Sequence, residues 1–276
     1  MRYFKMTLKY LFRNFIFIFF FAVIPSYFYA KSCNLENLTA VVLSVMQGRF
    51  NLDFFQLFSF FSLFDISRWY FALIAFALTV IFMAMLLSLM DKHMRVGTRS
   101  FKDLFQRMDY NIGSTFYILS LAFICYELWA LVSAGFISLV VMVITNGIAR
   151  CIICILFTIV IMVALCYIIS KFLLWLPCRH ITGYGFLDSL SYSSQLNANK
   201  KGGLFLSVLV PYFLCVILQC VVIVLSIYFE LGRLPFLFIE LIYLFVFLYF
   251  NVLMYVAFFD ANGEERMDLK RKGFFN

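Results

Sequence analysis

Residues Leu204–Phe229 read LFLSVLVPYFLCVILQCVVIVLSIYF, and residues Leu234–Phe259 read LPFLFIELIYLFVFLYFNVLMYVAFF. Both runs are longer than the roughly 20 apolar residues that a helix needs to cross the hydrocarbon core of a bilayer. The strands of a membrane β-barrel would instead alternate in polarity over roughly ten residues. Because both runs are apolar without such alternation, they predict membrane-spanning α-helices.

Four further runs have the same character, and the composition of the whole chain agrees with them. The chain is 65% hydrophobic and only 13% charged, whereas a soluble domain is about 45–50% apolar and about 25% charged. We therefore predict an all-α fold, a polytopic transmembrane bundle of about six spans that forms a single integral membrane domain over residues 1–276. The four further spans are predicted at Leu11–Tyr29, Tyr70–Met90, Ser114–Thr145 and Cys151–Leu176.

The basic residues predict the orientation of the chain in the membrane. The net charge is +8, but Lys and Arg fall in short clusters between the apolar runs and not in one patch, so we expect no nucleic-acid partner. Of the 22 Lys and Arg residues, 17 lie in the two termini and the even-numbered loops. Loops rich in Lys and Arg stay in the cytoplasm. The protein is thus expected in a bacterial cell membrane with both termini cytoplasmic.

The first apolar run has features of both a membrane anchor and a signal peptide. Lys5, Lys9 and Arg13 precede it, as basic residues precede the apolar region of a signal peptide. Cleavage after Ala30 would, however, place Phe28 where a small residue is needed. We expect an uncleaved anchor.

The first outer loop contains a second kind of apolar segment. Residues Asn51–Phe64 read NLDFFQLFSFFSLF, which is too short to span a bilayer and too apolar for water. This segment predicts an interfacial or re-entrant helix. Gly48 separates it from another apolar stretch, Leu38–Met46, so a re-entrant hairpin made of both stretches is an alternative.

Two cytoplasmic segments resemble each other and raise the question of a parallel duplication of a helical hairpin. Each holds a basic–His–apolar triplet, a Phe-x-Asp triplet and an Asn before the next span. If they are repeats, an axis along the membrane normal relates them; the alternative is that short inner loops commonly carry basic residues and an interfacial Phe. The first segment consists of Lys92–Met94, Phe101–Asp103 and Asn111, and the second of Arg179–Ile181, Phe186–Asp188 and Asn197.

The first of these segments also has a helical stripe. Phe101, Leu104, Phe105 and Met108 follow the spacing i, i+3, i+4, i+7, which is one face of a helix. It predicts an amphipathic helix on the inner leaflet.

Residues Met90–Gly97, reading MDKHMRVG between two spans, carry a family resemblance. This pattern resembles a group of uncharacterised six-span membrane proteins of Gram-positive bacteria. The hairpin–amphipathic loop–hairpin layout is similar, more distantly, to the membrane domain of bacterial glycerophosphodiester phosphodiesterases. The resemblance covers the middle of the chain and implies no activity, because the chain contains no phosphodiesterase catalytic domain.

Three polar residues within the predicted spans are candidates for an intramembrane site: Glu127, Glu240 and Asn251. Ionisable groups within membranes are costly and commonly functional. Glu127 could bind a proton or cation, or could be satisfied by a neighbouring helix. Glu230 and Arg233 lie just before Glu240, and a local Glu–Arg pair that caps this hairpin is favoured there. For Asn251 a hydrogen bond between helices is favoured.

The inner loops hold a candidate cytoplasmic interface. His93 and His180 are predicted at similar depth, and two His with carboxylates could hold a metal, but nothing in the sequence fixes the distances. We therefore predict solvated interface residues and no metal site, and interpret Cys151-x-x-Cys154 as helix packing. The interface candidates are His93, Phe101, Asp103, His180, Phe186 and Asp188.

The sequence contains no Gly-rich phosphate loop, nucleophile elbow or zinc motif, so we expect no enzyme and no cofactor. The preferred prediction is the membrane subunit of a transport system that has membrane lipids, a cytoplasmic ATPase or another membrane subunit as partners. The alternative is an accessory or scaffold protein in envelope or lipid homeostasis, or one with an immunity function.

Overall fold

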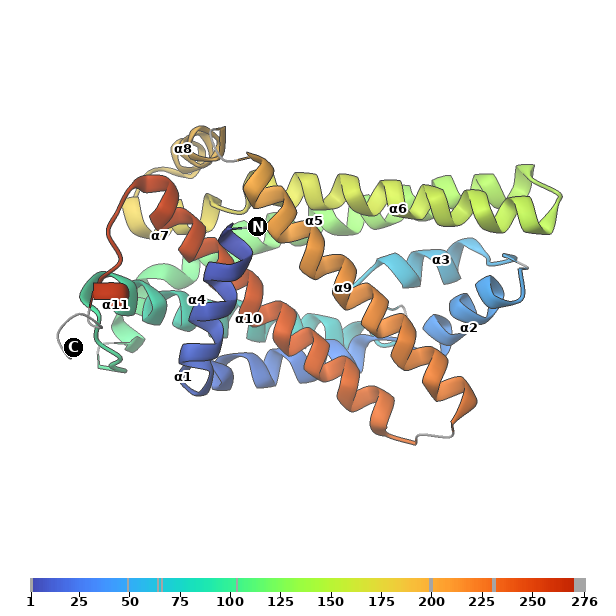
Figure 1. Ribbon diagram of the computed structural model, residues 1–276, viewed down its shortest axis with the longest axis horizontal. Coiled ribbons are helices and arrows are strands. Elements are labelled where there is room, and N and C mark those ends of the chain that lie inside the picture. The colour runs from blue at the N-terminus through green and yellow to red at the C-terminus, as the bar shows by residue number, and fades with distance from the viewer. Residues whose placement is uncertain are drawn as a thin grey trace.

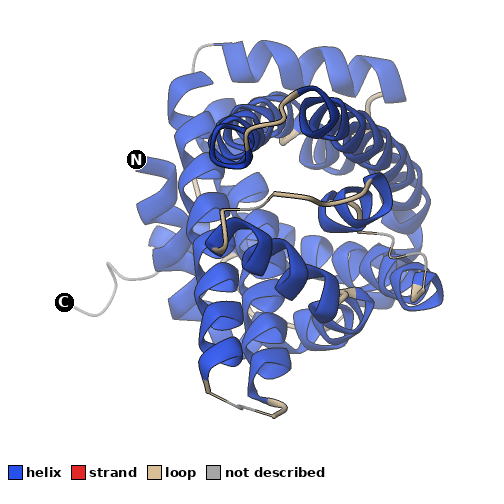
Figure 2. Ribbon diagram, turned by 90° about the vertical axis from the view of Figure 1, so that its right-hand side faces the viewer, coloured by secondary structure: helices blue, strands red, loops and turns tan. Residues whose placement is uncertain are grey.

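The computed structural model describes residues 2–48, 50–63, 65, 67–102, 104–198, 201–229 and 232–270. Asp103 and Glu230 lie outside these residues. Within the described ranges the protein consists of helices joined by short connections, with no strand (Figure 2). The helices are α1 (Arg2–Ser32), α2 (Leu35–Met46), α3 (Phe54–Phe61), α4 (Trp69–Val96), α5 (Leu104–Val143), α6 (Gly147–Phe172), α7 (Trp175–Thr182), α8 (Phe186–Ala198), α9 (Lys201–Tyr228), α10 (Leu234–Asn262) and α11 (Met267–Lys270).

Six segments are long and apolar enough to cross a membrane, which confirms the predicted all-α bundle of six spans. They are α1, α4, α5, α6 together with α7, α9 and α10. The chain is therefore a multi-pass membrane protein. We call the end of the bundle that carries α7, α8 and α11 the inner end, and the end with the α5–α6 turn the outer end (Figure 1). Both ends of the described chain lie at the inner end, where Arg2 forms an ion pair of 2.5 Å with Asp260 of α10.

The inner half of the bundle has the larger hydrophobic core. Helix α1 packs against both α10 and α4, and α10 is buried along most of its last three turns. Tyr249, Tyr255 and Phe258 are fully buried there. Their large apolar area favours association of the helices through close packing, as is usual where lipid rather than water surrounds a bundle.

The outer half is built around α5 and α6, which extend beyond α4. Asn111 of α5 contacts Ser88 of α4, and Phe123 contacts Phe76, so the two helices are antiparallel in constant register. In this register the α5–α6 hairpin runs roughly 20 Å past the start of α4, at 1.5 Å per residue. Helices α2 and α3 lie alongside this extension, against α9 and α5 respectively (Figure 1).

A second, smaller core fills this outer half. Leu57 and Phe61 of α3 are buried against Ala130, Ala134 and other residues of α5 and α6. The short α2–α3 pair thus covers flanks of the long hairpin that would otherwise lack a protein neighbour.

The predicted helix within Asn51–Phe64 is confirmed as α3. Asp53 begins it with a capping box, in which Gln56 N–H donates to the Asp53 carboxylate and Asp53 N–H donates to the Gln56 side chain. Gly48 turns the chain with a positive φ of 62°, close to the α5–α6 turn. From that level α3 runs along α5 and ends beside Tyr126 and Glu127, so α2 and α3 form a helical hairpin that turns at Gly48.

The predicted separate amphipathic helix at Phe101–Met108 is wrong. Leu104 begins α5 itself, which continues for 40 residues without a break. At roughly 60 Å this helix is about twice as long as a bilayer core is thick, so its first turns extend the span and do not form an independent surface helix. The second inner segment does form a separate helix, α8, after the short α7.

Candidate functional site

Glu127, the most deeply placed acidic candidate, is held by the end of α3. Its carboxylate accepts hydrogen bonds from Ser62 Oγ at 2.5 Å and from the backbone N–H of Leu63 at 3.0 Å. The neighbouring Tyr126 hydroxyl donates to Phe61 O at 2.7 Å. We call these contacts the outer clasp. The Glu127 carboxylate therefore fixes the short helix α3 against α5. Of the two predicted roles of Glu127, this arrangement corresponds to hydrogen bonding with a neighbouring segment, and not to binding of a proton or cation.

The other two intramembrane candidates have few polar contacts. No side-chain hydrogen bond or ion pair joins Glu240 or Arg233 to another of the described residues, and Glu230, the other acidic residue of the expected local pair, lies outside them. Asn251 is buried, and its side-chain N–H donates to Phe247 O of the same helix at 2.7 Å. The predicted bond between helices is wrong for this amide, because a side chain in a helix reaches the carbonyl four residues earlier.

The two histidines lie in different environments at the inner end. His93 is buried, with Nδ1 at 2.9 Å from the Tyr10 hydroxyl of α1. Near the same Tyr10 side chain, Arg266 and Asp268 form a buried bidentate ion pair, with N–O distances of 3.1 and 2.9 Å. The Arg266 guanidinium lies 5.5 Å from the centre of the Tyr10 ring. The described residues after α10 therefore dock on α1 and α4.

His180 faces α5. Its Nε2 lies 3.0 Å from Thr115 Oγ1, which itself donates to Asn111 O at 2.9 Å. Since a hydroxyl has a single proton, the consistent assignment makes His180 Nε2–H the donor and leaves Nδ1 as an acceptor. Nδ1 is buried and has no partner among the described residues.

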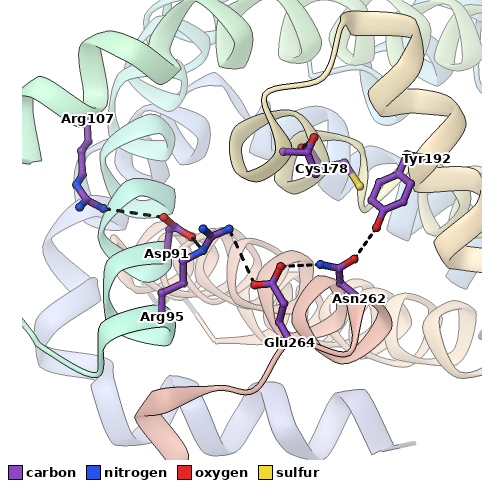
Figure 3. Close-up of polar contacts among 8 residues, drawn as sticks. Asp91, Arg95, Arg107, Cys178, Tyr192, Asn262 and Glu264 are labelled. Atoms are coloured by element: carbon purple, nitrogen blue, oxygen red, sulfur yellow. Dashed lines mark hydrogen bonds and ion pairs between the residues drawn. The ribbon is translucent and has the colours of Figure 1, made fainter.

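A chain of polar contacts joins four elements of the inner end (Figure 3). Asp91 of α4 lies 2.9 Å from Arg95 and 4.0 Å from Arg107 of α5. Glu264, beyond the end of α10, continues the chain from Arg95 at 4.0 Å, and accepts from Asn262 at 2.6 Å.

The last link of this chain reaches α8. The Tyr192 hydroxyl donates to Asn262 Oδ1 at 2.5 Å. Burial raises the pKa of Tyr192, so its phenol stays neutral and remains a donor. The contacts thus connect α8 to the C-terminal end of α10 and, through it, to α4 and α5.

Two adjoining cavities open beside this chain of contacts. The smaller, of about 440 Å³, is polar and lies between α4, α5 and α7; the larger, of about 500 Å³, lies between α5 and the α7–α8 connection. Tyr110 and Asn111 line both. The smaller is also lined by Ser88, Asp91, Gln106, Arg107 and His180, and the larger by Gly113, Ser114, Tyr117, Ile118, Arg179, Gly183 and Phe186. We call the two together the inner cavity.

The α7–α8 connection shapes the wall of the inner cavity. Gly183 ends α7 with a positive φ of 70°, and its N–H donates to Arg179 O at 3.2 Å. Arg179 Nη1 in turn donates to the carbonyls of Gly183 and Tyr184, which holds the guanidinium at the turn. Phe186 packs against Trp175 and against Tyr117, with ring centres 4.5 and 4.8 Å apart.

The predicted interface residues are thus only partly brought together. His180 and Phe186 line the inner cavity, whereas His93 faces α1. Phe101 packs on Phe17 of α1, with ring centres 4.9 Å apart, and remains 55% exposed. Asp188 is exposed in the first turn of α8, and Asp103 lies outside the described residues.

Neither cysteines nor histidines form a metal centre in the part of the chain that the structure describes. No group of three or more His, Cys, Asp or Glu residues is close enough to hold an ion there. Cys151 and Cys154 are buried free thiols within the outer core, consistent with helix packing.

The lining residues that sequence reasoning missed are mainly Arg107, Arg179, Tyr110 and Asn111. Arg107 counted only toward the orientation of the spans, Arg179 toward the orientation and as the start of a basic–His–apolar triplet, and Asn111 only as the end of a similar segment. For Asn111 the sequence held one signal, because each of the two similar segments ends in an Asn. In the structure each of these Asn side chains contacts the preceding span. Asn111 donates to Ser88 Oγ at 3.1 Å, and Asn197 donates to Ser170 O at 2.7 Å.

This correspondence agrees with a duplication, but the two segments differ in structure. The first passes directly into span α5, whereas the second contains two short helices, α7 and α8. The duplication therefore stays a prediction. Comparisons of this chain with protein-family models, with curated proteins and with solved structures gave no match.

Proposed function

We propose that this protein is an accessory protein of lipid homeostasis in a bacterial cell membrane, with both termini in the cytoplasm. In this proposal its inner end binds lipid of the cytoplasmic leaflet and catalyses no reaction. The observation that supports it is the inner cavity, which combines Arg side chains with an aromatic rim at the end of the spans. Basic pockets between spans on the cytoplasmic side are a recurrent way to bind lipid headgroups.

The proposed resemblance to the membrane domain of glycerophosphodiester phosphodiesterases and to six-span proteins of Gram-positive bacteria is compatible with this role. Glu127 supports it indirectly. Its carboxylate is engaged by the outer clasp, so it is better suited to fixing α3 than to carrying a proton or cation through the membrane.

The test is depletion of the protein in its native cell, followed by quantification of each phospholipid class and of envelope integrity. We expect an altered proportion of at least one class, restored by the wild-type gene. Unchanged lipid composition together with an intact envelope would contradict the proposal.

A second candidate is the membrane subunit of a transport system. It is favoured by the chain of contacts from Arg107 to Tyr192, through which contact of a cytoplasmic ATPase with α8 could affect α4 and α5. Two apolar side chains, Phe105 and Leu187, are 70% and 72% exposed at the inner end and could take part in such a contact.

Purification from native membranes in mild detergent separates the two candidates. A stoichiometric ATPase or second permease in the preparation would support the transport subunit. Recovery of the protein with lipid alone would support the lipid role.

A further inference from the structure

The inner cavity has an excess of positive charge. Asp91 is the carboxylate that lines it, and Asp91 lies closer to Arg95, at 2.9 Å, than to Arg107, at 4.0 Å. The Arg107 side chain is 43% exposed. No carboxylate is found among the residues lining the larger part, where Arg179 provides the charge. An anionic ligand would therefore meet two guanidinium groups: Arg107, whose ion pair with Asp91 is long at 4.0 Å and shared with Arg95, and Arg179, which has no carboxylate partner among the described residues.

The same cavity offers neutral donors and open space. Tyr110 and Tyr117 line it, and these two residues are 77% and 60% exposed. Gly113 has no heavy atom within 4 Å of the position that a Cβ would take, which leaves room for a ligand beside the backbone. Guanidinium groups with added hydroxyl donors suit phosphate oxygens in particular, because charge-assisted hydrogen bonds are the strong ones.

The surroundings of the cavity favour a ligand that also has an apolar part. Above the cavity along α5, Phe116 and Leu121 are 55% and 39% exposed on the outside of the bundle. The paired rings of Tyr117 and Phe186, with centres 4.8 Å apart, add apolar surface to the lining of the cavity itself. A headgroup in the cavity would thus leave its acyl chains next to an apolar helix face.

We propose that the inner cavity binds the phosphate of an anionic glycerophospholipid of the cytoplasmic leaflet through Arg107 and Arg179. This assignment deepens the lipid role proposed above, rests on it, and names the ligand class. Gly113 and Ser114 line the part of the site that holds Arg179, and Tyr110 lines both this part and the part that holds Arg107.

The experiment is a lipid titration of the purified full-length protein, followed by native mass spectrometry. The probes are phosphatidylglycerol, zwitterionic phosphatidylcholine, and inorganic phosphate as a competitor. We expect phosphatidylglycerol to bind about tenfold more tightly than phosphatidylcholine, because both lipids carry the phosphate but the choline ammonium of phosphatidylcholine would lie beside two guanidinium groups of the same charge. The double variant R107Q/R179Q should lose this preference.

Two further variants isolate the cause. Arg99→Gln removes an exposed basic residue of the same loop that does not line the cavity, and should leave the preference unchanged. Gly113→Leu fills the cavity and keeps both arginines, and should weaken binding of phosphatidylglycerol severalfold. Because leucine favours a helix more than glycine does, this variant should fold, and its unfolding temperature provides the check.

The outcomes separate the site from the function. Equal binding of the two lipids, or an unchanged preference in R107Q/R179Q, would overturn the site. Competition by millimolar inorganic phosphate as strong as by lipid would assign the cavity to a soluble phosphate compound and overturn the lipid ligand. If depletion changes lipid composition while the double variant still prefers phosphatidylglycerol, the function stands and the site is wrong. Loss of the preference with unchanged lipid composition would support the site and contradict the function.

Discussion

The inner and outer ends of this bundle use polar residues in opposite ways. At the outer end, the carboxylate of Glu127 accepts from two donors of one short segment, and the clasp closes a compact apolar core. At the inner end, polar and charged groups in contact are spread over α4, α5, α8 and the segment after α10, and those of α4 and α5 border an open cavity.

This difference distinguishes polar residues that hold the fold in place from polar residues that are available to bind a ligand. An intramembrane carboxylate is usually a candidate for function, yet Glu127 has its acceptor sites matched to donors of its own chain. An arginine has five N–H donors, and the two arginines of the inner cavity use only some of them among the described residues: Arg107 lies 4.0 Å from Asp91, and Arg179 donates through Nη1 alone. In a membrane protein, the number of donors left over after folding is therefore a better guide to a ligand site than the depth of a charge.

The largest expected effect concerns the buried ion pair of the inner end. In Asp268→Ala, Arg266 keeps a buried charge without its carboxylate; both side chains are less than a tenth exposed in the wild type. Loss of one partner of a buried pair costs about 3–5 kcal/mol. Denaturant unfolding in detergent micelles should show a loss of this size in the free energy of unfolding.

The double variant R266M/D268L is the matched control for this prediction. It removes both charges and keeps apolar volume beside Tyr10, so it should be considerably more stable than Asp268→Ala. Equal losses in the two variants would show that packing, and not an unpaired charge, is responsible.

A smaller effect is expected at the outer clasp. Glu127→Ala leaves the N–H of Leu63 and the hydroxyl of Ser62 without their acceptor, which costs about 1–3 kcal/mol. Glu127→Gln keeps one acceptor oxygen for Leu63 and should lose less than half as much. Thermal unfolding measures both variants. A severe growth defect of a well-folded Glu127→Gln protein would contradict a purely positioning role and favour transport.

The sequence predicted the six spans because their long apolar runs are independent of tertiary contacts. It also predicted α3, since Asp53 and Gln56 form a local capping box. The sequence did not predict features that depend on contacts between helices. Leu104 belongs to α5 because α4 provides a packing partner there, and α3 packs along α5 because α5 and α6 extend beyond the start of α4. Likewise, Arg107 and Arg179 are 72 residues apart in sequence, and only the fold brings them to one cavity.

The two Asn contacts of the inner end test the proposed duplication. Asn111→Ala removes a bond to Ser88, and Asn197→Ala removes bonds to Ser170 O and Lys171 O at 2.7 and 3.3 Å. Each variant should lose about 1 kcal/mol. If the segments are equivalent, hydrogen exchange should become faster near the start of α5 in the first variant and in α8 in the second. Faster exchange in only one of them would argue against equivalent roles.

The smallest expected effect is on the reactivity of Cys33, which reports how accessible the outer end is to solvent. Burial raises the pKa of the Cys33 thiol, just after α1, to about 11 from a usual value of 9.0. At pH 7.5 its thiolate fraction is thus about a hundredfold lower than usual, and the thiolate is the reactive form. A membrane-impermeant maleimide should label Cys33 slowly, and the rate should rise with pH until about 11. E36C in a C33A background places a thiol at an exposed position of α2 and should react at the ordinary rate from outside the cell. Rapid labelling of Cys33 at pH 7.5 would mean that the outer end is as accessible to solvent as the inner end. It would contradict the proposed contrast between a compact outer end and an accessible inner end.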